Sequence, residues 1–275
     1  MTSRPVADLI ATACPGGLGA FNVITIEHAE AIAAAAEAAK RPVLLQLSEN
    51  TVRYHGTLAP IALACLRIAA DSDADIAVHL DHATSFELIH TAVDLGIRSV
   101  MYDGSTLDYA ENVSATADIV SWCHDRGVFV EAELGEVGGK DGAHAPGVRT
   151  DPDEAVEFVA ATGVDALAVA VGSSHAMRTR TAELDNDLIA RLAAKVPVPL
   201  VLHGSSGVSD AGLRAAVTHG MTKINIATRL NILATEAIRA VLVDGPTIAD
   251  PRRYLRPARD AIRSEVERLL LVLAG

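Results

Sequence analysis

The chain has little lysine and no long apolar segment, and each of these shortages narrows the possible functions. Lysine occurs only at Lys40, Lys140, Lys195 and Lys223, and 35 acidic residues against 23 basic ones give a net charge of −12. This excess argues against nucleic acid and against an anionic membrane as partners. No apolar run reaches the roughly 18 residues of a membrane-spanning helix, and residues 1–13 carry no signal-peptide pattern.

Cysteine is also scarce, and it occurs only at Cys14, Cys65 and Cys123. An odd number of widely spaced cysteines is typical of reduced thiols and not of a disulfide framework. We therefore expect a cytoplasmic protein without disulfides. With 275 residues, half of them hydrophobic, the chain is large enough to bury an extensive core without a second domain.

Short β-rich runs alternate with longer Ala- and Leu-rich stretches along the whole sequence. The alternation predicts strands at 20–24, 43–47, 76–80, 98–102, 128–132, 166–170, 199–202 and 223–226. Stretches with apolar residues at helical spacing lie between them, for example at 26–40, 86–95 and 154–161. Eight such repeats predict an α/β protein with a (β/α)8 TIM barrel as a single domain, 1–275. The alternative is an open doubly wound sheet, but no GxGxxG fingerprint follows the first strand.

Polar side chains recur where the predicted strands end, which is the face where such barrels carry catalytic groups. A single polar residue there is equally typical of an ordinary loop. The whole set, with three histidines and three carboxylates, indicates a functional site. Its members are Asn22, Ser48, Asp81 with His82, Asp103, Glu133, Ser173 with His175, His203 and Asn225.

Three of these residues are candidate zinc ligands: His82, His175 and His203. A catalytic zinc takes three imidazoles and leaves a position open, and these three would converge only if the barrel closes. Neutral imidazole suits Zn²⁺ better than Mg²⁺. Asp103 and Glu133 could be further ligands, acceptors that fix an imidazole tautomer, or ion-pair partners. The remaining histidines are expected on helices (His28, His90, His124, His219), in loops (His55, His144) or inside a strand (His79).

Small residues follow the last two strands, where barrels of this kind often bind phosphate. Backbone N–H groups and a helix N-terminus would favour an anion there, although an ordinary Gly/Ser turn is the alternative. The residues concerned are Gly204, Ser205, Ser206, Asn225, Ile226, Ala227 and Thr228. The Gly-rich stretch 135–147 after the fifth strand predicts a lid, with Asp141 as its acid or base.

Six stretches in order carry a family resemblance: AFN at 20–22, HLDH at 79–82, SVMYDGS at 99–105, VEAELG at 130–135, LHGSSG at 202–207 and KINIAT at 223–228. With these motifs the chain resembles the class II, zinc-dependent ketose-bisphosphate aldolases, the family of fructose- and tagatose-bisphosphate aldolases. The resemblance runs from about residue 20 to Arg252 and so covers nearly the whole chain.

The resemblance implies that His82, His175 and His203 bind zinc and that Asp81 is the catalytic acid/base. It implies a phosphorylated ketose as substrate, cleaved to dihydroxyacetone phosphate and glyceraldehyde 3-phosphate. The expected cofactor is zinc, with a monovalent cation as a further candidate. Substrate contacts are implied for Ser48, Gly204, Ser206, Asn225 and Thr228, and a second or displaced metal ion for Asp103 and Glu133.

The resemblance also implies a homo-oligomer, a dimer or tetramer. From the sequence itself we expect a C-terminal helical extension at about 251–273. Two positions depart from the family pattern, because Ala176 follows His175 in place of Gly, and Lys140 with Asp141 replaces the usual lid residues. Arg252, Arg253, Arg256 and Arg259 could contact a second phosphate or form a solvated face.

Three alternatives stay open from the sequence. The chain could be an aldolase of the same class for another phosphorylated sugar or sugar acid. It could be a Schiff-base aldolase, which needs an interior lysine such as Lys223. It could also be a non-catalytic partner subunit, which need not keep the three histidines and Asp81.

Overall fold

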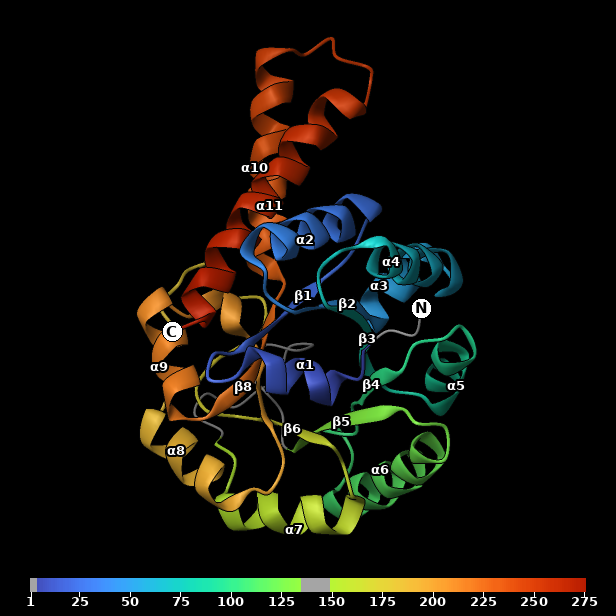
Figure 1. Ribbon diagram of the computed structural model, residues 1–275, viewed down its shortest axis with the longest axis vertical. Helices are drawn as coiled ribbons and strands as arrows, with labels where there is room; N and C mark the ends of the chain where they lie inside the picture. The colour runs from blue at the N-terminus through green and yellow to red at the C-terminus, as the bar shows by residue number, and fades with distance from the viewer. Residues whose placement is uncertain (1–3, 135–148) are drawn as a thin grey trace.

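Eight parallel strands close into a single barrel in chain order, because β1 pairs with both β2 and β8. The computed structural model describes residues 4–134 and 149–275. Figure 1 shows the helices arranged around the strands. The predicted (β/α)8 barrel is therefore confirmed. Its strands are β1 (Leu18–Asn22), β2 (Val43–Ser48), β3 (Ile76–Ala83), β4 (Ser99–Tyr102), β5 (Phe129–Leu134), β6 (Ala166–Val169), β7 (Leu200–Leu202) and β8 (Met221–Ile226).

The helices follow the strands, and two of them were not anticipated from the sequence. The short helices α1 and α3 escaped prediction, and His55 ends α3 and does not lie in a loop, so that expectation was wrong. The helices are α1 (Val6–Ala13), α2 (Ile26–Ala39), α3 (Glu49–His55), α4 (Ala59–Asp71), α5 (Phe86–Asp94), α6 (Tyr109–His124), α7 (Pro152–Thr162), α8 (Asn186–Lys195), α9 (Asp210–His219), α10 (Thr228–Asp244) and α11 (Arg252–Leu273), with a 3-10 turn η1 (Ser205–Gly207).

The main core lies between the strands and the surrounding helices. Along β2, Val43, Leu45 and Leu47 are fully buried in this layer, since alternate side chains of a strand point to the same side. The long helices bury one apolar side against it. On α11, for example, Ile262, Val266 and Leu269 recur at helical spacing.

The interior of the barrel is apolar at one end and polar toward the other. Helix α1 covers the amino-terminal end, where Leu9 packs with Leu18 and Leu44 in a separate apolar cluster. Above that cluster, the interior holds a layer of buried polar side chains that includes Gln46, His79, Ser99, Glu131 and Lys223. TIM barrels usually fill such layers with branched apolar residues, so this polar layer needs hydrogen-bond partners.

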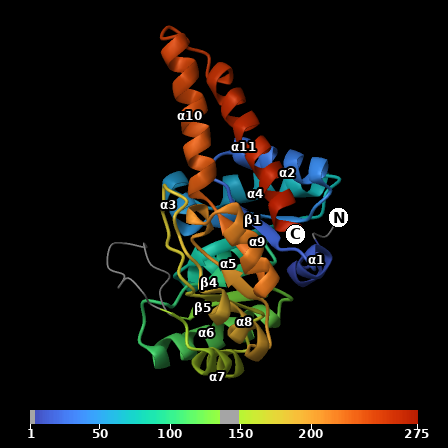
Figure 2. The same ribbon diagram turned by 90° about the vertical axis from the view of Figure 1, so that its left-hand side faces the viewer.

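Helices α10 and α11 pack against one another as an antiparallel pair that projects beyond the ring of helices (Figure 2). The base of the pair packs on α2 and α9. Among the helices of the described residues, none is both long enough and apolar enough to cross a membrane.

Candidate metal centre and active-site cavity

A cavity of about 390 Å³ opens where the strands end. This volume falls in the range of small-molecule sites. Residues at or after the carboxyl ends of β1, β2, β3, β6, β7 and β8 contribute to its walls, so distant parts of the sequence meet there. The lining residues are Asn22, Ile24, Ser48, Asn50, Thr51, Tyr54, Asp81, His82, His175, Ala176, Gly204, Ser205, Ser206, Asn225, Ala227, Thr228 and Asn231.

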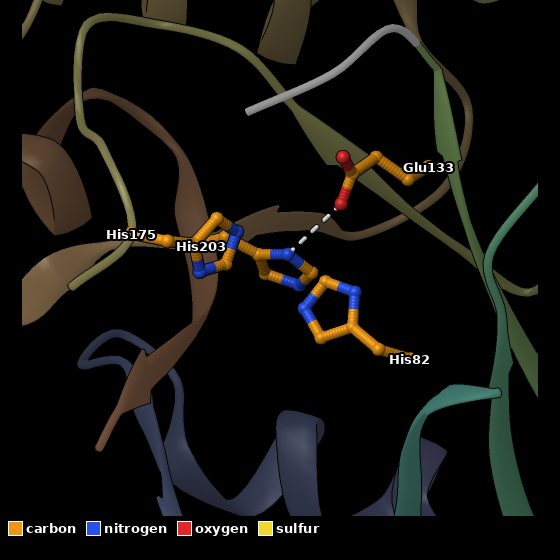
Figure 3. A group of neighbouring side chains, drawn as sticks. All are labelled: His82, Glu133, His175 and His203. Atoms are coloured by element: carbon orange, nitrogen blue, oxygen red, sulfur yellow. Dashed lines mark ion pairs between the residues drawn. The ribbon is translucent and has the colours of Figure 1, made fainter. Parts of the chain in front are cut away.

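Three imidazoles and one carboxylate gather at one side of this cavity. His82, His175, His203 and Glu133 each offer a ligand atom, and these atoms all lie within 4.8 Å of one another. Figure 3 shows the three rings turned toward a common space, with the Glu133 carboxylate beside His203. The histidines predicted from strand ends are thus brought together by the closed barrel, and Glu133 joins them.

Adjacent residues Asp81 and His82 both reach the cavity because β3 is irregular at its end. The register between β3 and β4 shifts between Leu80 and Ala83, and His82 adopts a left-handed conformation with φ +52°. In a regular strand the two side chains would point to opposite faces. The irregularity therefore lets one strand supply both a histidine for the cluster and a neighbouring carboxylate.

In two of the histidines, the ring nitrogen that points away from the cluster lies within hydrogen-bond distance of a carboxylate. Metal-bound imidazole usually has such a partner. His82 Nδ1 lies 2.6 Å from Asp103 Oδ2, so Nε2 is the nitrogen left for a metal. His203 Nε2 lies 3.1 Å from Glu131 Oε1, and its Nδ1 belongs to the cluster. Asp103 lies outside the cluster itself and acts on His82. The donor set of three imidazoles and one carboxylate fits a zinc-type ion.

The electrostatics of the cluster suit a cation. Burial lowers the pKa of His203, but hydrogen bonds to Glu131 and Glu133 outweigh burial and raise it to about 9. The metal-free site therefore favours a positive charge at this ring. Since a ligand imidazole must be deprotonated, metal binding should release a proton.

Asp81 is held ionised at the base of the cavity. Burial raises its pKa, but the positive charges of His82 and Lys223, together with other nearby imidazoles, outweigh burial and lower it to about 2. Asn22 Nδ2 donates to Asp81 Oδ2 at 2.9 Å, and Asn225 Nδ2 donates to Oδ1 at 3.4 Å. Gln46 in turn donates to Asn22 at 3.2 Å. Asp81 is therefore a fixed carboxylate that can accept a proton.

The opposite wall of the cavity is made by η1 and the start of α10. Gly204 has φ +67°, and a Cβ at this position would lie 2.6 Å from the Ser174 backbone, so only glycine fits. Ser206 Oγ accepts from the backbone N–H groups of Ala227 and Arg229 at 3.3 and 3.1 Å. A hydroxyl and a helix N-terminus at one place form an environment that favours an anion.

Ala176, one of the departures from the family pattern, also lines the cavity. It has φ +58°, a left-handed conformation that side chains with a Cβ adopt at some cost in free energy. The chain beside His175 therefore adopts a left-handed conformation even though its residue carries a methyl group.

The remaining predicted residues are placed as follows. Ser48 lines the cavity, and Ser205 also does so while its hydroxyl donates to the Leu202 carbonyl. Ile226 is buried in the core, and it is absent from the described residues that line the cavity. Asp141 lies outside the described residues, as does His144.

The structure gives no support to a Schiff-base lysine. Lys223 is fully buried, and its Nζ donates to Glu131 Oε2 at 2.7 Å. No lysine is among the described residues that line the cavity. The C-terminal arginines lie elsewhere on the chain: Arg259 pairs with Glu30 of α2, and Arg252 pairs with Asp250.

Sequence reasoning missed several residues at this site. Asn50, Tyr54 and Asn231 line the cavity from α3 and α10, and no motif marked them. Glu131 and Lys223 form the layer beneath it. Their signal was strand parity: Glu131 lies two residues before Glu133, and Lys223 two residues before Asn225, so each faces the same side of its strand as that site residue.

Comparisons with known proteins agree with this geometry. The family model described as "Fructose-bisphosphate aldolase class-II" matches residues 8–274. A fructose-bisphosphate aldolase of Geobacillus stearothermophilus is 40% identical over 253 residues, which are 90% of this chain and 88% of that protein. One of Staphylococcus epidermidis is 39% identical over 254 residues, 91% and 89% of the two chains. The crystal structure of the YdjI aldolase from Escherichia coli K12 superimposes with a TM-score of 0.85 at 32% identity, covering 99% of this chain and 97% of that one.

Proposed function

The chain belongs to the class-II fructose-bisphosphate aldolase family, and from this membership we propose that it is a zinc enzyme that cleaves fructose or tagatose 1,6-bisphosphate. As a member of the family it is an aldolase, a carbon–carbon lyase that acts on a ketose bisphosphate. The observation that carries the proposal is the convergence of the ligand atoms of His82, His175 and His203 next to the cavity that Asp81 lines.

Zinc would be held by the three histidines, with Glu133 as a further ligand for a second or displaced ion. When bound, it would supply Lewis-acid chemistry that stabilises the negative charge developing on the substrate. The carboxylates of Asp103 and Glu131 would keep the ligand rings oriented.

Asp81 would act as the base in the cleavage direction. Because it is ionised, it can take the proton from the C4 hydroxyl of the ketose while the C3–C4 bond breaks. The C4 oxygen then becomes the aldehyde oxygen of glyceraldehyde 3-phosphate. The electron pair of the broken bond stays on the three-carbon phosphate fragment, which gains a proton at C3 to give dihydroxyacetone phosphate.

The group that protonates C3 is proposed to come from the stretch 135–147, with Asp141 as the donor. In the condensation direction the same groups act in reverse order. Asn22 and Asn225 hold the Asp81 carboxylate in place through their amide groups, so its two oxygens keep a fixed orientation.

The phosphate of the dihydroxyacetone phosphate portion is proposed to bind between η1 and α10. Gly204 allows the backbone to approach closely, and Ser206 with Thr228 places hydroxyls at the start of α10. Ser48 and Asn22 line the same cavity and would contact substrate hydroxyls. A homo-oligomer in the cytoplasm remains part of the proposal, as does a monovalent cation as a further cofactor.

A coupled cleavage assay tests this proposal. Purified protein is given fructose 1,6-bisphosphate or tagatose 1,6-bisphosphate, and release of triose phosphate is followed. We expect turnover of at least one of the two epimers, loss of turnover with a chelator, and no trapping by borohydride. Borohydride inactivation in the presence of substrate would point to Schiff-base chemistry and overturn the proposal. Absence of cleavage of both epimers by zinc-loaded protein would overturn the substrate assignment.

A further inference from the structure

Directly beneath His203, the barrel interior holds a buried carboxylate–ammonium pair that lies outside the cavity walls. Glu131 on β5 and Lys223 on β8 are fully buried, and Lys223 Nζ lies 2.7 Å from Glu131 Oε2. Because β5 and β8 are not neighbours in the sheet, the pair spans the interior of the barrel. Burying two charges costs desolvation free energy, and apolar residues of similar volume often stabilise a fold equally well. The pair therefore calls for a role besides stability.

The second oxygen of Glu131 connects this pair to the metal centre. Glu131 Oε1 lies 3.1 Å from His203 Nε2, and both side chains are fully buried. On the other side of the same ring, His203 Nδ1 lies 3.1 Å from Glu133 Oε2, as the dashed line in Figure 3 shows. Nε2 of His203 therefore contacts Glu131, and Nδ1 belongs to the cluster of ligand atoms.

We propose that Glu131 and Lys223 are positioning residues that make His203 a metal ligand through Nδ1. An ionised carboxylate can only accept hydrogen bonds, so Glu131 requires a proton on His203 Nε2. The neutral ring then has its lone pair on Nδ1, the nitrogen that faces the cluster. A neutral amide at position 131 could donate as well as accept and would permit the opposite tautomer.

Lys223 has two effects on Glu131. It balances the carboxylate charge in a site without solvent, where an uncompensated charge would be strongly unfavourable. It also holds Oε2 away from the cavity, so that Glu131 stays an acceptor for His203 and does not turn upward to compete for the metal. His79 also lies near this oxygen, with its Nε2 3.8 Å from Glu131 Oε2.

His79 supplies a way to separate this role from general packing. Its Nδ1 lies 2.7 Å from Ser99 Oγ in the same buried layer. Within the described part of the chain, the hydrogen bond of His203 Nε2 is with Glu131 and not with His79 or Ser99. Removal of the Ser99 hydroxyl would therefore disturb the buried polar layer while leaving the contact between Glu131 and His203 in place.

The inference rests on the proposed function, because it takes zinc as the metal, and its test measures zinc binding independently of aldol cleavage. The zinc dissociation constant of metal-free protein is measured by competition with a chromophoric chelator. We expect Glu131→Gln and Lys223→Met to weaken zinc binding about 10- to 100-fold, as for other contacts to ligand imidazoles. With saturating zinc, the KM for substrate should stay at the wild-type value, since neither residue lines the cavity.

Two matched controls accompany these variants. Ser99→Ala removes a buried polar contact of the same layer, and Lys195→Met removes a lysine from the exposed pair with Asp153. Both should bind zinc like the wild type. Lys223→Arg, which keeps a positive donor near Glu131, should recover most of the affinity that Lys223→Met loses.

Folding is checked by circular dichroism and thermal melting of the metal-free proteins. If a single variant fails to fold, the double variant Glu131→Gln/Lys223→Met leaves no uncompensated charge and provides the measurement. Zinc binding within twofold of wild type in folded Glu131→Gln or in the double variant would overturn the positioning role alone. Failure of the wild type to bind zinc would overturn the proposed function together with it.

Discussion

At the residue scale, Asp81 has the surroundings that define a chemical role most directly. It is almost fully buried, it is held between Asn22 and Asn225, and its pKa of about 2 keeps it ionised at neutral pH. A carboxylate in this state is prepared to accept a proton, and it sits next to His82 without belonging to the ligand cluster. Acid/base function and metal binding are therefore separable by substitution.

We expect Asp81→Asn to lower kcat by about 10²- to 10⁴-fold, the usual contribution of a general base. The zinc content should equal that of the wild type, because the ligand atoms come from other residues. Steady-state kinetics and metal analysis of the same preparation check both statements. Turnover close to wild type would remove Asp81 from the mechanism, and loss of zinc would make it a metal-site residue.

The individual residues also show where sequence reasoning succeeds. His82, His175 and His203 could be predicted because each lies at or after the end of an apolar strand, and a closed barrel brings strand ends together. The contact between Glu131 and Lys223 could not, because strand parity gives the side of a strand but not which residue lies across the barrel. That depends on the register of all eight strands.

At the scale of elements, β3 and the start of α10 each position a distinct part of the site. The irregular end of β3 directs two neighbouring side chains into the cavity. No sequence pattern predicted this irregularity. The start of α10 was predicted from small residues after the last strand, and Ser206 caps it from a separate loop. Short α1 and α3 were missed because 8 and 7 residues are too few for a clear helical period.

Ser206→Ala should weaken substrate binding through the α10 N-terminus. The change removes the hydroxyl that accepts from the N–H groups of Ala227 and Arg229 and that would contact the phosphate. We expect KM to rise about fivefold to tenfold, equivalent to a hydrogen bond of about 1 kcal/mol. Ser209→Ala is the matched control, because Ser209 caps α9 through Gly212 away from the cavity. An equal rise in KM in both variants would contradict the assignment.

A second element-scale prediction concerns the attachment of α11. Glu265 is buried on this helix and accepts from Arg229 of α10 and from Arg268. Burial raises its pKa, but the hydrogen bonds of the two arginines outweigh burial and lower it below the usual value. Glu265→Gln should lower the free energy of unfolding by about 1–3 kcal/mol at pH 7, as for a hydrogen bond to a charged group.

The difference in unfolding free energy between wild type and Glu265→Gln should depend on pH with a definite sign. Because the folded-state pKa of Glu265 is lowered, its contribution is fully present above the unfolded pKa of about 4.3 and is lost as pH falls through the folded value. The gap in urea unfolding between wild type and Glu265→Gln should therefore shrink as pH falls below about 4.3. Glu267→Gln is the control, since within the described part of the chain the ion pairs to Arg229 and Arg268 are made by Glu265 and not by Glu267. A stability difference between wild type and Glu265→Gln that does not change with pH would contradict the stabilising role of the ionised Glu265 carboxylate.

At the scale of the whole molecule, closure of the barrel brings the residues of the site together. His82, His175 and His203 belong to separate segments, and only the pairing of β1 with β8 completes the ring around them. The alternation of strand and helix made this architecture predictable, because it leaves few ways to bury so many apolar strands. The projecting pair of α10 and α11 depends on packing with α2 and α9, and strand periodicity carries no information about it.

A zinc titration of metal-free protein, with cleavage of fructose or tagatose 1,6-bisphosphate as readout, tests the central claim most directly. Protein is stripped with a chelator, zinc is restored in steps, and activity is plotted against bound metal. The account predicts negligible activity without metal and a linear rise that ends near one zinc per chain. Replacement of His203 by Ala should abolish the rise. Full activity in the stripped protein would contradict the account.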